Sequence, residues 1–321
     1  MLEQLKNKMN ELKNMNKDEL KAKAKEVLNK SNELFNETSN VIKQKTDQAV
    51  TMYQDYQNRE RETLPQALAT KVDREIKEKY KKICIKGDLM PGKVTIFETK
   101  VGGFPYLPNG MNFPKDANGE DMRLLVQIKC DDFINLPNFP KTGMIQIFTS
   151  KSFNFGSNGV NPFDNTNFKI IYHNEIDKTI RLNDLYEKTL LNELEEYPIR
   201  CECPIYFTNV YDTISIYDNR YIVDFNKLIN QEKHYKEFNL NEIMPLISNV
   251  ETTFNKVGGY PNFYAPDARK LEDDVNVLLF QLETDNKIVD TGRDTLLKFY
   301  IKETDLINLN FEHVFYIIEN K

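Results

Sequence analysis

The amino-acid sequence predicts an α+β protein with a mainly antiparallel β body in two related half-domains, preceded by a long N-terminal helical arm. Three observations predict this class. The first 64 residues contain neither proline nor glycine, short runs of β-branched and aromatic residues fill most of the chain after residue 80, and one turn motif occurs twice. We therefore expect a helical arm at 1–64, a first half at 65–195 and a second half at 196–321.

Apolar residues in the arm recur at helical spacing, beginning with Leu2, Leu5, Met9 and Leu12. This spacing predicts one or two long amphipathic helices. Because the apolar stripe is thin, the arm is expected to need a surface to pack on. It either packs along the body or on itself, or it forms a coiled coil with a partner or a second copy. Acidic residues are mixed through its polar face, which argues against a membrane anchor.

A second helix is predicted from Pro65, because proline is well tolerated in the first turn of a helix. Leu68, Val72, Ile76 and Tyr80 follow at intervals of four residues and form one apolar stripe. We expect this helix to open the globular body.

Beyond this helix the apolar pattern changes to that of β-strands, in runs bounded by turn-rich loops. A helix is expected between them at about 218–238, so the body belongs to the α+β class. The expected strands are KVTIFETK at 93–100, LLVQIKC at 124–130, GMIQIFTS at 143–150, FKIIYH at 168–173, CPIYFT at 203–208, VLLFQLE at 277–283, LLKFYIK at 296–302 and HVFYIIEN at 313–320.

The motif Lys-Val-Gly-Gly-aromatic-Pro begins at Lys100 and again at Lys256, an offset of 156 residues (256 − 100). A Leu-Leu-x-Gln-aliphatic strand follows each copy and carries Gln127 or Gln281, which we expect to be buried and bonded to backbone groups. Paired glycines suit a turn with positive φ, and a proline ends a strand ladder, so we expect two matching structural turns. The residues assigned to these turns are Gly102, Gly103, Pro105, Gly258, Gly259 and Pro261.

A longer pattern surrounds both motifs. It comprises VGGFPYLPNGMNFPKDANGEDMRLLVQIKCDDFINLPNFPKTGMIQIF at 101–148, VGGYPNF at 257–263, VLLFQLETD at 277–285 and DLINLNFEHVFY at 305–316. This pattern resembles the YwqG-like family of uncharacterised bacterial proteins, over roughly 65–321. The resemblance implies a duplicated α+β fold with no assigned activity. Some relatives are suspected of neutralising toxins in bacterial competition, and the helical arm lies outside the resemblance.

Charge is unevenly divided along the chain. Residues 1–82 carry 18 Lys and Arg against 14 Asp and Glu, a net charge of +4, and the remainder carries 25 against 35, a net charge of −10. An acidic body argues against nucleic-acid binding. We expect no membrane span, because no run reaches about 18 apolar residues. Four cysteines in so long a chain do not suggest a disulfide framework, and the start shows no secretory pattern, so we expect a cytoplasmic protein.

No combination of residues predicts catalysis, a metal or a cofactor. The three histidines are widely spaced, and Cys201 and Cys203, expected on one strand, lack a second pair to complete a zinc site. The segment DANGED at 116–121 suits an Asn-Gly hairpin better than a calcium loop. We therefore assign no catalytic residue, no metal and no cofactor.

The weak candidates for ligand binding lie in two segments. The loop SFNFGSNGVNPFDN carries Phe153, Phe155 and Phe163, which either recognise a ligand or pin the loop to the core. Asp131 and Asp132 form a carboxylate pair that either binds a cation, supplies an acid–base pair, or is a solvated end of a strand.

Two functions fit these observations. The first is a non-enzymatic protein-binding module of unknown partner, immunity-like if the partner is a toxin, in which the acidic body meets a basic protein and residues 1–64 add contacts or self-association. The alternative is a small-ligand binder, or an enzyme, with its site between the half-domains and near the Gly-Gly turns. The missing catalytic motifs favour the first function, and a deep pocket with convergent polar groups would favour the second.

Overall fold

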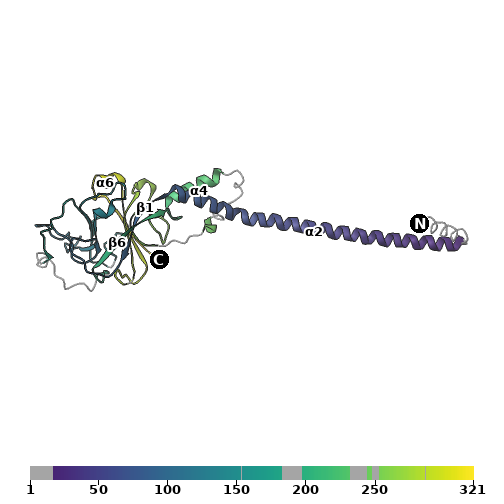
Figure 1. Cartoon of the computed structure of the whole chain (residues 1–321), viewed down its shortest axis with the longest axis horizontal. Coiled ribbons are helices and arrows are strands. Elements are labelled where there is room, and N and C mark those ends of the chain that lie inside the picture. Colours follow the sequence, from purple (N-terminus) through teal and green to yellow (C-terminus); the bar gives the residue numbers. More distant parts are fainter. Residues whose placement is uncertain (1–16, 153, 183–196, 232–243, 248–252, 286) are drawn as a thin grey trace. The chain divides into compact units, whose positions relative to one another are not determined.

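Figure 1 shows the computed structural model, which describes residues 17–152, 154–182, 197–231, 244–247, 253–285 and 287–321. The chain divides into two compact units, Met1–Ala67 and Leu68–Lys321, and each is described by itself. No helix in the described ranges is both long and apolar enough to cross a bilayer. The expected division of the body between residues 195 and 196 stays a prediction.

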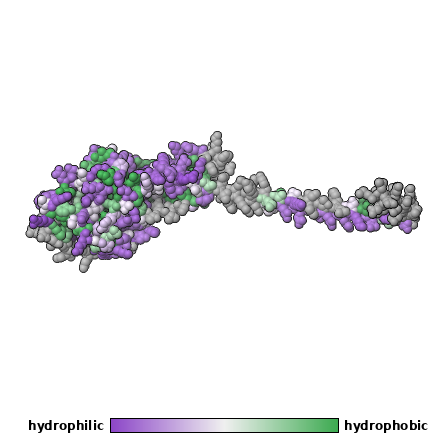
Figure 2. Space-filling model, viewed as in Figure 1, coloured by the Kyte–Doolittle hydropathy of each residue, from purple (hydrophilic) through white to green (hydrophobic). Residues whose placement is uncertain are grey.

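Helix α2 runs without interruption from Lys17 to Lys79. The expected second start at Pro65 is therefore wrong. A proline removes only one N–H donor from the helical ladder, and the flanking residues are mostly good helix formers. Figure 2 shows hydrophilic residues along the described part of α2 with few apolar ones among them. The described side chains up to Met52 are exposed, and the apolar positions expected before Lys17 lie outside the described residues.

Among the described residues, ten strands form one curled antiparallel sheet, which confirms the α+β class and the antiparallel pairing. The strand order across the sheet is β10-β9-β8-β7-β1-β6-β2-β3-β4-β5. The strands are β1 (Lys81–Leu89), β2 (Lys100–Val101), β3 (Arg123–Lys129), β4 (Met144–Thr149), β5 (Phe168–His173), β6 (Cys203–Thr213), β7 (Asn255–Gly258), β8 (Val277–Glu283), β9 (Thr295–Ile301) and β10 (Phe315–Asn320).

Strands β1 and β6 form the centre of this sheet and pair along their whole shared length, from Lys81 opposite Thr213 to Leu89 opposite Ile205. Strand β1 also pairs with β7, and β6 also pairs with β2. Each central strand therefore leads to one wing of the sheet, β7 to β10 on one side and β2 to β5 on the other.

The strand expected at 93–100 is absent except for its last residue, which begins β2. The backbone before it is held in a loop by side chains. Gln127 Nε2 donates to the carbonyl oxygens of Ile96 and Glu98, each at 2.9 Å, and Glu98 Oε2 accepts from the Thr95 N–H at 2.7 Å. These carbonyl groups are thus satisfied without a neighbouring strand. Strands β1 and β7 were not expected, because their runs are short or rich in lysine.

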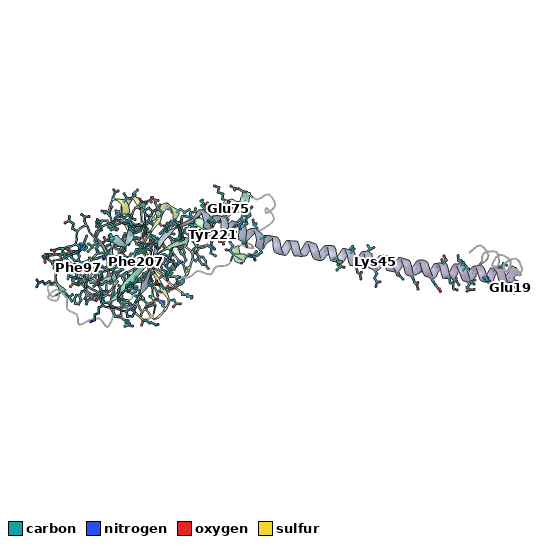
Figure 3. The ribbon with its side chains drawn as sticks, in the orientation of Figure 1. Glu19, Lys45, Glu75, Phe97, Phe207 and Tyr221 are labelled. Carbon is teal, nitrogen blue, oxygen red and sulfur yellow. The ribbon has the colours of Figure 1, made fainter. Side chains whose placement is uncertain are left out.

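Helix α4 (Asn219–Gln231) lies within the expected helix at 218–238, of which residues 232–238 are not described. Its buried face carries Tyr221, Phe225 and Ile229 at four-residue spacing and packs on the last turns of α2 (Figure 3). The Tyr221 hydroxyl donates to Asp73 at 2.8 Å. The other described short helices are α6 (Glu303–Ile307) and three 3₁₀ turns at Cys130–Phe133, Met244–Leu246 and Leu271–Asp273.

The main core lies on the inner face of the curled sheet and combines residues of both wings. Its aromatic side chains show that the outer strands meet. The ring of Phe168 on β5 lies 6.0 Å from Phe299 on β9 and 5.1 Å from Tyr316 on β10, and the last two rings stack at 4.1 Å. The sheet therefore curls far enough to bring its two edge strands into side-chain contact.

Candidate functional site

The two Gly-Gly motifs form turns directly after β2 and at the end of β7. All four glycines have the expected positive φ, which is 65° at Gly102, 72° at Gly103, and 69° at both Gly258 and Gly259. A Cβ on Gly102 would lie 2.6 Å from Ile199 Cγ2, and one on Gly259 would lie 2.5 Å from Cys84 Cβ. Both the backbone conformation and the close packing therefore require glycine here.

Each motif also buries its lysine, and the sequence interpretation had assigned no role to either. Lys100 Nζ lies 2.9 Å from Glu202 Oε2, and Lys256 Nζ lies 3.0 Å from Asp212 Oδ2. Glu202 and Asp212 lie near opposite ends of β6, so the central strand supplies an acid to both turns. Burial lowers the pKa of Lys100, and the hydrogen bond that Lys100 donates to Glu202 opposes that shift. The signal available in the sequence was the repetition of lysine itself.

The two glutamines that follow the turns are fully buried and hold the same backbone positions. Gln127 Oε1 accepts from the N–H of Tyr106 at 2.9 Å, and Gln281 Oε1 accepts from the N–H of Asn262 at 2.9 Å. Gln281 Nε2 donates to the carbonyl of Phe254, much as Gln127 Nε2 donates to loop carbonyls before β2. The expected bonding of both amides to backbone groups is therefore found.

A buried polar pair lies beside each glutamine. On β4, Gln146 Nε2 donates to the carbonyl of Tyr106 at 2.8 Å, and its Oε1 lies 2.8 Å from His173 Nε2. On β9, Lys298 Nζ donates to the carbonyl of Asn262 at 3.1 Å and lies 2.5 Å from Glu319 Oε1. Burial lowers the pKa of His173, and burial lowers that of Lys298 to about 8 despite the opposing charge of Glu319.

A pocket of about 270 Å³ opens beside the first turn. We name it the turn pocket, and residues 102–105, 113, 123–124, 197 and 199–202 line it. Its wall is mostly apolar, with buried Phe113, Leu124, Tyr197 and Ile199. The Tyr197 hydroxyl is bonded to Thr149 Oγ1 at 2.8 Å, which fixes this ring in the wall.

The turn pocket also holds two guanidinium groups and one carboxylate. Arg200 lies 3.2 Å from Asp290, and Glu202 is neutralised by Lys100. The third charged group is Arg123, the first residue of β3, which is partly buried. Its Nε is shielded from solvent, and in the described ranges no residue accepts a hydrogen bond from it.

The corresponding space at the second turn is filled. Tyr260 occupies the place in the motif that Phe104 occupies in the first, and only 7% of its surface is exposed. Its ring meets Tyr80 edge-on at 6.0 Å, and Lys82 Nζ lies 4.2 Å above it. Tyr260 belongs to the apolar cluster that joins the end of α2 to α4. The two turns thus share their backbone scaffold and differ in what covers their aromatic residue.

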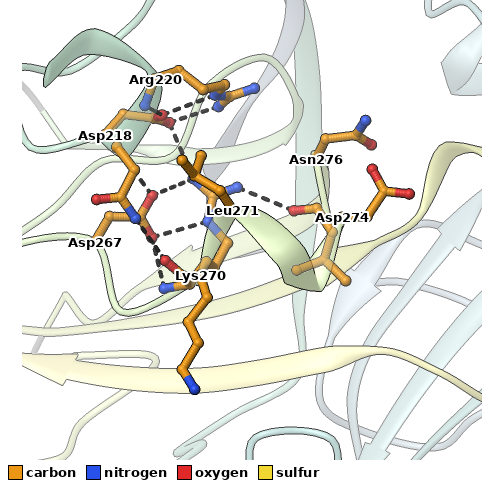
Figure 4. Close-up of a pocket in the computed structure, with 10 residues that line it drawn as sticks. Asp218, Arg220, Asp267, Lys270, Leu271, Asp274 and Asn276 are labelled. Atoms are coloured by element: carbon orange, nitrogen blue, oxygen red, sulfur yellow. Dashed lines mark hydrogen bonds and ion pairs between the residues drawn. The ribbon is translucent and has the colours of Figure 1, made fainter. Parts of the chain in front are cut away.

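A second, smaller pocket of about 150 Å³ lies between the start of α4 and the loop before β8 (Figure 4). Four of its charged side chains are paired with one another. Asp218 bonds both Arg220 at 2.6 Å and Arg269 at 3.0 Å, and Arg269 also bonds Asp267 at 2.7 Å. Burial would raise the pKa of Asp218, but hydrogen bonds and the charges of the two arginines hold it below its usual value. This network fixes the loop on α4, and its two arginines and two aspartates already serve as partners for one another.

The aromatic loop candidates contribute to packing. Phe155 is fully buried, with its ring 5.6 Å from that of Tyr197, and Phe163 packs edge-on against Phe315 at 5.2 Å. Phe153 lies outside the described residues. The loop is therefore pinned to the core at the two described positions, in agreement with one of the two interpretations that the sequence left open.

The acidic candidates lie apart from the turn pocket. Asp131 is exposed, and Asp132 accepts a hydrogen bond from Thr99 Oγ1 at 2.7 Å. The structure places Cys203 at the start of β6 but Cys201 before it and exposed, so the two cysteines do not share a strand as expected. Within the described ranges, no three His, Cys, Asp or Glu side chains are grouped closely enough to hold a metal ion.

Arg123 is the functional candidate that the sequence interpretation missed, because a lone arginine at the start of a strand carries no motif.

A comparison with curated proteins found no match. A family model described as a domain of unknown function, DUF1963, matches residues 99–319. The match spans more than half of the chain, from the residue before β2 into β10, and it includes every residue that lines the turn pocket. On this evidence the chain belongs to the DUF1963 family.

Proposed function

We propose that this protein is a non-enzymatic binding protein whose ligand site is the turn pocket. The observation that carries the proposal is the contrast between the two turns. The second turn is covered by the packed cluster around Tyr260, whereas the first leaves a concave, mostly apolar space beside Phe104. Small-molecule sites are typically concave, mostly apolar and supplied with few polar groups.

We further propose that the two turns descend from an internal duplication. Strands β1 to β5 match β6 to β10 in order, and a register shift occurs between Leu124 and Val126 on β3 and between Leu278 and Phe280 on β8. The paired lysines, glycines and glutamines support the same relation. Under it, one copy has been used for packing against α2 and α4, and the other has kept its pocket.

The reactivity of Cys201 tests the ligand site directly. Cys201 lines the turn pocket and is the exposed cysteine, whereas the other three are buried. Burial raises the pKa of Cys84 and Cys130 to about 12 and that of Cys203 to about 11, so these thiols should react slowly near neutral pH. A neutral reagent such as dithiodipyridine should therefore report on Cys201.

We expect small apolar or amphipathic compounds that occupy the turn pocket to slow the fast thiol reaction. The Cys201→Ser variant is the control, because it should lack the fast phase. If a panel of single-ring compounds leaves the rate unchanged at concentrations up to their solubility, the proposed site is wrong.

A protein partner is the second candidate function, and the charge distribution favours it. The chain beyond residue 82 carries the net charge of −10, which suits a basic partner, and an immunity-like role against a toxin would be one form of it. Exposed apolar residues on α2, such as Val27, Leu28 and Met52, suit a coiled coil formed by residues 1–64. The narrower YwqG-like assignment and a cytoplasmic location are part of this proposal.

Sedimentation of the full chain tests the self-association. A mass that stays monomeric at all concentrations would contradict a coiled coil between copies. An affinity capture from native lysate tests the partner, and the absence of any stoichiometric, salt-sensitive protein would count against the binding module.

A further inference from the structure

We infer that the turn pocket binds a small organic monoanion, a carboxylate on a single-ring or branched apolar body, with the carboxylate paired to Arg123. This inference rests on the proposed function of the same pocket and names its ligand class.

Arg123 has one N–H donor that is shielded from water and lacks an acceptor among the described residues. Its guanidinium is always charged near neutral pH, and its Nε is shielded from solvent without an acceptor in the described part of the chain. Buried N–H donors are normally hydrogen-bonded, because a donor shielded from water without an acceptor is costly. An anion in the pocket would supply the missing partner.

The other two charged groups in the lining of the turn pocket, Arg200 and Glu202, already have partners. Arg200 is bound to Asp290, and the carboxylate of Glu202 is held by Lys100. One unpaired cation therefore remains in the described lining, and it balances a single negative charge. A carboxylate matches the planar fork of a guanidinium and carries that single charge, whereas a phosphate dianion would need a further cation.

The shape and polarity of the wall also constrain the ligand. Phe113, Leu124, Tyr197 and Ile199 present buried apolar surface to the pocket, and its volume of about 270 Å³ is at the small end for ligand sites. Because Tyr197 is fixed by its bond to Thr149, the wall is preformed. A compact body of one ring, with its carboxylate toward Arg123, fits these constraints.

The matched position in the other wing also bears on the role of Arg123. Arg123 opens β3 and pairs with Thr149, and Val277 opens β8 and pairs with Ile301. Both precede a Leu-Leu pair and the same register shift. The wing whose turn is packed under the cluster around Tyr260 has Val277 at this position. The wing with the open turn pocket has Arg123 there. The scaffold therefore does not require the arginine.

The test uses three carboxylates and their neutral amides: benzoate and benzamide, phenylacetate and phenylacetamide, and cyclohexanecarboxylate with its amide. Binding to the full chain is measured by calorimetry and by protection of Cys201 from dithiodipyridine. We expect at least one carboxylate to bind at least about tenfold more tightly than its amide, since a hydrogen bond to a charged group is typically worth that factor or more.

Three variants separate the contribution of Arg123 from a general effect of charge or folding. Arg123→Met should weaken the carboxylate at least about tenfold and leave the amide unchanged, while Arg123→Lys should keep part of the preference. Arg293→Met is the control for the loss of an arginine, because Arg293 is exposed and does not line the turn pocket, and it should change the affinity less than about twofold. Near-UV circular dichroism verifies that each variant is folded.

The possible failures are distinguishable. Amides that bind as well as carboxylates, or carboxylate binding that survives Arg123→Met, would overturn the anion inference and keep the pocket as a ligand site. A panel in which no compound binds or protects Cys201 would overturn both the inference and the proposed function.

Discussion

Replacing the lysine of each turn motif by methionine should destabilise the protein unequally. Methionine keeps an unbranched apolar stem of similar reach and removes the charge. The side chains of Lys100 and Lys256 are 1% and 0% exposed, so the two substitutions start from the same burial. The difference lies in the carboxylate that each one leaves behind.

Lys256→Met strips the counter-ion from Asp212, whose side chain is 11% exposed and which keeps the bond from the N–H of Tyr260 at 2.8 Å. Breaking a buried ion pair in this way typically costs about 3–5 kcal/mol. Lys100→Met leaves Glu202, which is 32% exposed on the wall of the turn pocket and can recover hydration. We expect it to cost about 1–2 kcal/mol after allowance for solvent screening.

Urea unfolding followed by near-UV circular dichroism measures both changes, with equal slopes as the condition for comparing midpoints. The double variant Lys256→Met/Asp212→Asn should recover part of the loss, because no buried charge is left unpaired. A loss for Lys100→Met that equals or exceeds the loss for Lys256→Met would refute the reasoning. Strictly additive losses in the double variant would refute the assignment of the ion pair.

Three further outcomes are expected. Gly102→Val and Gly258→Val should each lower the free energy of unfolding by about 1–3 kcal/mol. Gly292 also has positive φ, but a Cβ added there would meet no atom within 4 Å. Gly292→Val should therefore lower the melting temperature less than the other two substitutions. Because the folded pKa of Lys298 is about 8 and its ordinary value is 10.5, the unfolded state binds the extra proton between these values. The free energy of unfolding should therefore rise as the pH increases from about 8 to 10.5. In Lys298→Met, the contribution of Lys298 to this rise should be absent from urea midpoints measured across the same pH range. Deleting residues 1–60 should leave a folded body with native near-UV dichroism, and an insoluble or molten product would contradict this boundary.

The strands that the sequence predicted are those whose own residues decide their structure. Runs such as 277–283 and 296–302 are rich in large apolar residues, and strands β8 and β9 were found there. The run at 93–100 also contains β-branched and aromatic residues but forms no strand before Lys100, because Gln127 donates hydrogen bonds to the carbonyl oxygens of Ile96 and Glu98. Strand β1 was not predicted because its run is rich in lysine, although it pairs with a strand on each side.

The candidate site could be predicted only in part. The glycines of the turns were identifiable because positive φ has a residue signature, and all four conform to it. Arg123 had no such signature, because its distinguishing property is the lack of a partner among the described residues, and that depends on the fold. Alignment of the two wings would have found it, since the same register contains Val277 in the other wing.

The two wings also indicate which part of the scaffold is fixed by backbone chemistry. The carbonyl oxygens of Tyr106 and Asn262 occupy matched places after the two turns, and they accept hydrogen bonds from buried side chains on β4 and β9, respectively. One wing meets this requirement with the amide of Gln146, and the other meets it with the ammonium of Lys298. Because a buried carbonyl requires a donor but not a particular residue, the scaffold admits both solutions. Neither Arg123 nor Val277 donates a hydrogen bond to these carbonyl groups. Arginine occupies this position beside the turn with an open pocket, and valine occupies it in the wing whose turn is packed under the cluster around Tyr260. This correlation is the reason to look for the function of the protein at Arg123.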